Sequence, residues 1–187
     1  GVGFGPDGTV WGGEILEAGY SDYARVGHLR LQPMPGGDLC TYYPVRMLAS
    51  ILGTVLSQKE VCDITERHAK YGLRHGLDEL NTLLKQIKSP IIPRTTSSGR
   101  FLDAVAAVMG ICYKRTYEGE PAIRLEAVAS QGDPSKMQLK PQIHEQNGKY
   151  IFDTSQLLLD IIAVQRGAHI PDLCAATQRA FATGMAE

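Results

Sequence analysis

The sequence lacks a long apolar run, a clear excess of charge of either sign and any paired cysteine motif. Its longest apolar stretch, residues 157–164, is interrupted by Asp160 and falls well short of the roughly 18 residues that a membrane-spanning helix needs. Nineteen Lys and Arg balance twenty Asp and Glu, so the broad basic surface typical of nucleic-acid-binding proteins is missing. We therefore expect neither a membrane nor a nucleic acid as a partner.

The cysteines are scattered, and no histidine stands at zinc-ligand spacing from them; they are Cys40, Cys62, Cys112 and Cys174. This spacing argues against a structural zinc site and against a compact disulfide framework, and it is typical of reduced thiols in the cytoplasm. None of the five histidines stands at catalytic spacing either, so we expect each to be a surface or helix-capping residue. The chain begins with Gly1 rather than Met, and we expect an excised domain.

Length and composition predict one folded unit, because 187 residues with 43% hydrophobic side chains suit a single core. Glycines and turn residues separate three extended runs at its start, over residues 1–5, 9–17 and 23–31. Turns such as Pro6-Asp7-Gly8 connect neighbouring antiparallel strands, so these runs predict a three-stranded antiparallel meander.

After residue 44 the apolar spacing changes to that of helices. The predicted helices cover residues 44–56, 57–72, 77–87, 100–109, 121–129, 154–164 and 171–187, with a short strand at 149–152. Ser57 and Glu60 match a capping box, and Thr154 or Ser155 is the expected cap of the sixth helix. Residues 131–148 are rich in turn residues and predict a surface loop. A few strands followed by many helices indicate the α/β class.

The glycine-rich start is the first candidate for binding an anion. Gly1, Gly3 and Gly5 lack side chains, which lets a phosphate approach the backbone N–H groups. A simple glycine-rich edge strand with a turn is the alternative interpretation. Walker and Rossmann sites are excluded, because no Gly-Lys-Ser/Thr occurs and no helix follows the glycines.

The second candidate is the segment of residues 95–100, which precedes a predicted helix. Thr96, Ser97, Gly99 and Arg100 place hydroxyls, a glycine and a guanidinium where free N–H groups and the helix dipole favour an anion. The alternative is an N-capping Ser98 beside an exposed arginine. Asp103, one turn further on, is either a helix-start carboxylate or an acceptor for a ribose hydroxyl.

A third candidate is Gly119 with Glu120, at the junction between a loop and the predicted helix 121–129. The backbone is again open to a ligand there, although an ordinary loop-to-helix junction explains the same residues.

In this order the segments resemble the carbamoyltransferase domain of the hydrogenase maturation family HypF, which is similar to the universal threonylcarbamoyl-adenosine synthesis family. The resemblance rests on five blocks, namely residues 1–14, 35–38, 95–103, 104–107 and 116–119. It covers roughly residues 1–130 and the last helix. It implies that residues 1–187 are one lobe of an actin-like ATPase with a ribonuclease-H-like fold, with residues 131–170 as a candidate insertion.

The resemblance also implies a reaction. HypF-type enzymes use carbamoyl phosphate and ATP, through carbamoyl-adenylate, to carbamoylate the C-terminal cysteine of a HypE-like acceptor during maturation of nickel–iron hydrogenase. ATP or carbamoyl-adenylate is then the expected ligand. Its expected contacts are Gly1, Gly3, Thr96, Ser97, Gly99, Arg100, Asp103, Gly119 and Glu120, and no catalytic residue is assigned. A metal ion is implied with ligands outside this chain, and the other domains of the parent protein are implied partners, so the isolated chain is expected to be inactive.

Two other functions are compatible with the residues. One is phosphoryl transfer by a kinase of the same actin-like superfamily, in which glycine hairpins also face phosphates. The other is a degenerate, non-catalytic lobe for partner docking, which is indicated by Arg124 at a position where the family has Glu.

Overall fold

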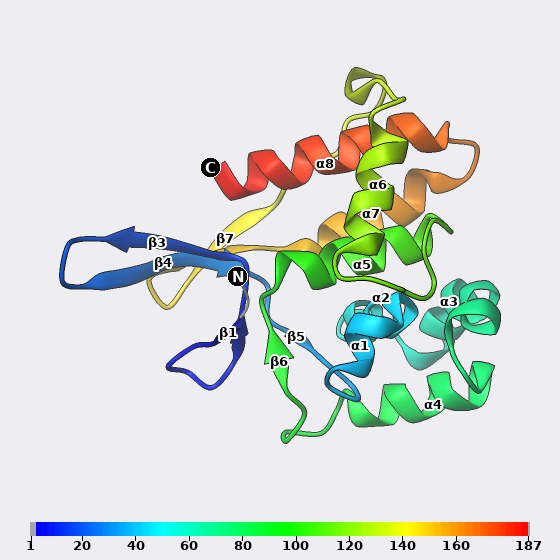
Figure 1. Ribbon diagram of the computed structural model, residues 1–187, viewed down its shortest axis with the longest axis horizontal. Helices are drawn as coiled ribbons and strands as arrows, with labels where there is room; N and C mark the ends of the chain where they lie inside the picture. Colours follow the sequence, from blue (N-terminus) through cyan, green and yellow to red (C-terminus); the bar gives the residue numbers. More distant parts are fainter. Residues whose placement is uncertain (1–2, 187) are drawn as a thin grey trace.

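The structure is a computed structural model that describes residues 3–186, which form eight α-helices, a short 3-10 helix and two four-stranded sheets (Figure 1). One sheet has the order β1-β2-β6-β5, with β1 (Gly3–Phe4), β2 (Val10–Trp11), β5 (Gln32–Pro33) and β6 (Arg94–Thr95). The other has the order β3-β4-β8-β7, with β3 (Glu14–Ala18), β4 (Tyr23–Leu29), β7 (Ile143–Gln146) and β8 (Lys149–Phe152). Both sheets are mixed, because β2 pairs parallel with β6 and β4 pairs parallel with β8.

The extended start of the chain forms two antiparallel hairpins, which belong to different sheets. β1 pairs with β2 and β3 pairs with β4, but the run of residues 9–17 is divided at Gly12 and Gly13. A Cβ atom added to Gly13 would lie 2.3 Å from the carbonyl oxygen of Thr96. Only glycine therefore lets the chain pass this close to the segment before α5 and continue into the second sheet.

Seven of the helices follow the predicted apolar stripes, and the short helix at residues 39–42 was not predicted. They are α1 (Leu39–Tyr42), α2 (Pro44–Gly53), α3 (Gln58–Gly72), α4 (Gly76–Gln86), α5 (Ser98–Val108), α6 (Glu120–Ala129), α7 (Thr154–Gln165) and α8 (Ile170–Ala186). The capping box of α3 is confirmed, since Ser57 Oγ accepts from the Glu60 N–H and the Glu60 carboxylate accepts from the Ser57 N–H at 2.8 Å. The predicted cap of α7 is wrong. Asp153 caps that helix, because its carboxylate accepts from two of the first free N–H groups.

The core is centred on α2, which packs against α5 in the middle of the molecule (Figure 1). Val45, Leu48, Ile51 and Leu52 of α2 are completely buried. Each such side chain contributes about 1.5–3 kcal/mol of hydrophobic stabilisation on burial. The start of α5 is therefore held on a rigid, well-packed support.

Residues 131–170 take part in the fold of this chain. β8 pairs with β4, and α7 buries Leu157, Leu158 and Ile161 in the core. The predicted loop contains a strand, β7, which a two-residue turn with positive φ at Asn147 and Gly148 connects to β8. Three of its four residues are exposed, so β7 lacks the alternating apolar pattern of a half-buried strand. That residues 131–170 are an insertion within the family stays a prediction.

His68 differs from the expectation of a surface or capping histidine, because it is 3% exposed. Its Nε2 accepts from Arg67 Nε at 3.0 Å, and its Nδ1 lies 3.0 Å from the Tyr113 hydroxyl. Burial lowers the pKa of His68 to about 4, so the ring is neutral at physiological pH. The α3 helical stripe places this residue inward, and the two hydrogen bonds satisfy its ring nitrogens.

Gly72→Ala should destabilise the fold. A Cβ atom at this position would lie 2.1 Å from Cγ2 of Val45, a fully buried core residue of α2. Overpacking of this kind costs about 1–3 kcal/mol, which should appear as a lower urea midpoint. Lys70→Ala, at an exposed position of the same helix, is the control. Equal urea midpoints for the two variants would show that the contact between residue 72 and Val45 adjusts without loss of stability.

Candidate functional site

A cleft of ≈ 480 Å³ brings together both segments that the sequence predicts to bind an anion. Gly3 lines it from the hairpin of β1 and β2 (residues 3–11), here called the glycine hairpin, and Ser97 and Arg100 line it from the start of α5. A Cβ atom on Gly3 would meet nothing within 4 Å, so the backbone at this position is open to a ligand. Two stretches that are far apart in the sequence thus share one concave surface.

The start of α5 is attached to the glycine hairpin by short hydrogen bonds. Thr95 Oγ1 donates to the carbonyl oxygen of Val10 at 2.9 Å, and Ser98 Oγ donates to that of Gly12 at 2.9 Å. Ser98 is therefore not the N-cap. Ser97 occupies the N-cap position, and its side chain makes no capping hydrogen bond. Its hydroxyl remains available at the positive end of the helix dipole.

Arg100 is largely buried, with a side chain 14% exposed, which contradicts the alternative of an exposed arginine. Its Nη2 lies 3.0 Å from Oδ2 of Asp103, whereas its Nη1 is buried and has no hydrogen-bond partner among the described residues. Burial raises the pKa of Asp103 to about 7, against the opposing charges of Arg100 and Arg115. Near neutral pH, Asp103 therefore neutralises Arg100 only in part, and the guanidinium retains attraction for an anion.

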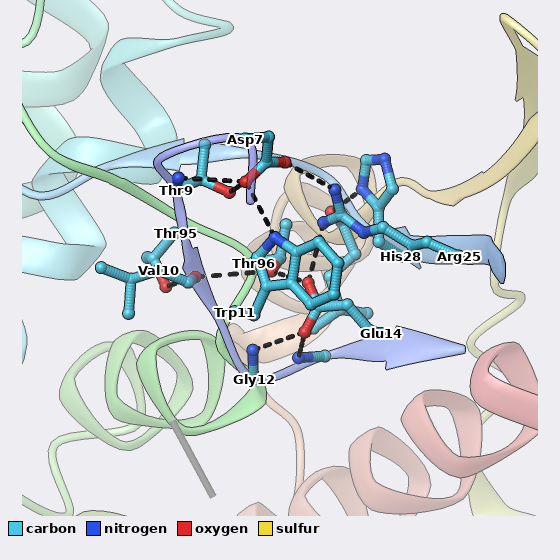
Figure 2. Close-up of polar contacts among 12 residues, drawn as sticks. Asp7, Thr9, Val10, Trp11, Gly12, Glu14, Arg25, His28, Thr95 and Thr96 are labelled. Atoms are coloured by element: carbon cyan, nitrogen blue, oxygen red, sulfur yellow. Dashed lines mark hydrogen bonds and ion pairs between the residues drawn. The ribbon is translucent and has the colours of Figure 1, made fainter. Parts of the chain in front are cut away.

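A single carboxylate, that of Glu14, joins the hairpin to the segment before α5 (Figure 2). Its Oε2 accepts from the N–H groups of Gly12 at 2.6 Å and Gly13 at 2.9 Å. Its Oε1 accepts from Arg25 Nη2 at 2.8 Å and from the hydroxyl of Thr96. Thr96 is thus engaged within the protein rather than directed into the cleft.

Arg25 extends this network to the tip of the first hairpin (Figure 2). Its Nη1 lies 2.9 Å from Oδ2 of Asp7, and its guanidinium carbon lies 4.4 Å from the centre of the Trp11 ring. Asp7 also accepts from the Trp11 indole N–H at 3.0 Å. The turn of the glycine hairpin is therefore held against β4 by ionic, cation–π and hydrogen-bonding contacts at once.

Several predicted site residues do not line the cleft, namely Thr96, Gly99, Asp103, Gly119 and Glu120, and Gly1 lies outside the described residues. Asp103 is buried behind Arg100 in α5. Glu120 turns back to accept from the Thr116 N–H at 2.5 Å, a hydrogen bond that lowers the pKa of its carboxyl. Gly119, with φ of 77°, makes this turn into α6 without strain.

Other residues of the cleft were not foreseen as site residues. Tyr42 and Arg115 line it together, with the Arg115 guanidinium carbon 4.8 Å from the centre of the Tyr42 ring. Asp38 and Glu118 supply two carboxylates. Both acidic residues belong to the sequence blocks on which the family resemblance rests. No spacing in the sequence connects Tyr42 with Arg115, because only the tertiary fold brings these two residues together.

Arg124, which reverses the charge that the family pattern has at this position, is not a cleft residue. Its side chain is 51% exposed, and its Nη1 lies 3.4 Å from Oε1 of Glu120. The reversal therefore creates a pair within α6 and brings no extra cation into the cleft.

No metal centre is found in residues 3–186, since no three His, Cys, Asp or Glu side chains converge there as a metal site would need. The residues present thus do not fit a resident metal ion. Within the same part of the chain, every helix is too short or too polar to cross a bilayer. The four cysteines are free.

Comparison with known proteins gives a consistent set of relatives. The family model described as "Carbamoyltransferase, Kae1-like Domain, second subdomain" matches residues 1–187. The chain is 43% identical over 161 residues to the probable carbamoyltransferase HypF of Methanocaldococcus jannaschii, covering 84% of this chain and 20% of that protein. It is 39% identical over 132 residues to a carbamoyltransferase HypF homolog of Cupriavidus necator, covering 70% of this chain and 32% of that protein.

Two solved structures agree with this assignment. The crystal structure of T. kodakarensis HypF matches with a TM-score of 0.87 and 34% identity, over 100% of this chain and 24% of that one. Full-length HypF in the phosphate- and nucleotide-bound form matches with a TM-score of 0.78 and 28% identity, over 94% of this chain and 26% of that one. The predicted α/β fold class is confirmed. The chain spans about a fifth to a third of the length of these relatives.

Glu14→Gln should loosen the connection between the hairpin and α5. A glutamine has one acceptor oxygen in place of two and no charge to balance the buried Arg25 guanidinium, so donors are left unpaired at a cost of about 1–3 kcal/mol. We expect faster amide hydrogen exchange at Gly12 and Gly13 and a lower urea midpoint. Glu17→Gln, at an exposed position of β3, the strand that also carries Glu14, should change neither. Unchanged exchange in Glu14→Gln would contradict the proposed connection.

Asp103→Asn should change how stability depends on pH. The folded carboxyl keeps its proton up to a pH of about 7, whereas an unperturbed carboxyl loses it near 3.8. Between these values the unfolded state binds fewer protons, so the wild-type free energy of unfolding falls as pH rises and then levels off. The difference between wild type and variant should change by an amount on the order of 1–4 kcal/mol across this range, as measured by urea unfolding. Parallel curves would show that Asp103 is ionised throughout.

Proposed function

This chain belongs to the HypF carbamoyltransferase family, as the second subdomain of its Kae1-like domain, and we propose that it forms one wall of a site for ATP or carbamoyl-adenylate. The observation that carries the proposal is the cleft in which Gly3, Ser97 and Arg100 meet. A nucleotide-bound structure of a HypF protein supports the same class of ligand for the family.

The chemistry of the cleft suits a phosphate group. Arg100 contributes a positive charge that Asp103 balances only in part, and Ser97 contributes a hydroxyl that caps no helix. The open backbone at Gly3 allows close approach from the opposite segment. Together these groups match an anion with several oxygens better than they match a neutral ligand.

In the proposed reaction, the cleft stabilises the leaving group, which is AMP. When the thiol sulfur of an acceptor forms a bond to the carbamoyl carbon of carbamoyl-adenylate, the bond from that carbon to the phosphate oxygen breaks and AMP departs as an anion. The thiol proton is released. Arg100 and Ser97 stabilise the charge that develops on the phosphate, because donors placed in advance do not have to reorganise during the step.

The complete activity requires more than this chain. We propose that other domains of the parent protein complete the nucleotide site and provide any metal ion, and that the acceptor is the C-terminal cysteine of a HypE-like partner in nickel–iron hydrogenase maturation. The reduced thiols are consistent with work in the cytoplasm. The 187-residue chain alone should therefore fold but bind nucleotide more weakly than the intact gene product.

Arg100→Ala in the intact gene product should weaken ATP binding by roughly 10- to 150-fold, the loss expected for hydrogen bonds to a charged group. Isothermal titration calorimetry measures the affinity directly. Arg124→Ala, which removes an exposed arginine outside the cleft, is the matched control and should bind as the wild type does.

ATP affinity that is unchanged in Arg100→Ala would show that the nucleotide binds at another surface of the protein. No heat with wild-type protein at millimolar ATP would favour the non-catalytic docking lobe, and phosphoryl transfer from ATP to a small acceptor would favour a kinase.

A further inference from the structure

Tyr42, at the end of α1, lines the cleft but has no role in binding an anion. Its ring is 49% exposed although it lines a concave surface, and Phe4 on the same cleft is 80% exposed. Aromatic rings are usually covered by the protein when they lie in a hollow, because their apolar faces are costly to leave in water. An aromatic surface in this position is suited to contact with a ligand.

The Tyr42 ring packs against the guanidinium of Arg115. The Arg115 guanidinium carbon lies 4.8 Å from the ring centre, and the Arg115 N–H donates to the Tyr42 carbonyl oxygen at 3.0 Å. The cation therefore covers one face of the ring, and the backbone hydrogen bond fixes the two residues relative to each other. Little conformational freedom is left for a ligand to remove when it packs on the exposed ring.

Two polar groups lie on the same helix turn as this ring. Asp38 and Thr41 both line the cleft, and Thr41 Oγ1 donates to the Asp38 carbonyl oxygen at 2.8 Å. The Asp38 carboxylate and the second lone pair of the Thr41 hydroxyl are acceptors. They suit the exocyclic amino group of adenine, which is a donor.

We propose that Tyr42 is the base platform of the nucleotide site, on which the adenine ring stacks while Arg100 binds the phosphates. The inference rests on the proposed function, and it deepens it by assigning the base to Tyr42 and the anion to Arg100 and Ser97. The ligand class is an adenine nucleotide rather than a phosphate or a carbamoyl group alone.

The test compares ATP with tripolyphosphate, which shares the anion but lacks the base. In the intact gene product, Tyr42→Ala should weaken ATP binding by roughly 5- to 150-fold, the equivalent of the ~1–3 kcal/mol that a base–aromatic stack contributes. Tripolyphosphate should bind to the variant and to the wild type within a factor of about two, because the anion subsite is unchanged. Titration calorimetry gives both affinities.

Two further substitutions separate stacking from support of the fold. Tyr42→Phe keeps the aromatic face and should retain ATP affinity, whereas Tyr42→Leu keeps an apolar side chain without a ring and should not. Tyr43→Ala is the matched control, since Tyr43 also lies beneath an arginine, with Arg74 at 5.1 Å, but does not line the cleft. Thermal unfolding of each variant checks that it is folded at the temperature of the titration.

The outcomes distinguish the two proposals. ATP binding that is lost in Arg100→Ala but unchanged in Tyr42→Ala would overturn the base platform and leave the nucleotide site intact. Equal losses for ATP and tripolyphosphate in Tyr42→Ala would also overturn it, because Tyr42 would then support the shape of the cleft. Wild-type protein that binds no ATP would overturn the proposed function itself.

Discussion

The cleft depends on the carboxylate of Glu14, which holds the glycine hairpin and the segment before α5 in one arrangement. Four donors from two parts of the chain converge on this one side chain, and Arg25 carries the contact on to the turn at Asp7. Buried polar networks of this kind specify one geometry, because any displacement leaves a donor or a charge unsatisfied.

Charge in the cleft is compensated only in part, and this sets its chemistry. Arg100 and Asp103 are paired one turn apart in α5, but burial favours the neutral form of the carboxyl. An incompletely balanced guanidinium costs stability in a folded protein and is commonly kept where a ligand will complete it. The packing of α5 against α2 contributes hydrophobic free energy that offsets this loss of stability.

Local patterns predicted most of the helices correctly, since each depends on residues within a few positions of one another. The capping box of Ser57 and Glu60 is such a case. The strand β7 was missed because it is an exposed edge strand whose residues give no alternating signal. The division of the extended run 9–17 between two sheets was also missed, because the reason for it is the close approach of Gly13 to Thr96, a residue distant in sequence.

For the site, the sequence by itself determined which chemical groups are present: side-chain-poor backbone at Gly3, and a hydroxyl and a guanidinium at Ser97 and Arg100. The tertiary structure alone decided which of them face the cleft. It directs Thr96 to Glu14 and Glu120 to Thr116, and it adds Tyr42 with Arg115. The physical reason is that the sequence defines which donors and acceptors are present. Which partner each donor or acceptor contacts depends on how distant segments of the chain pack together.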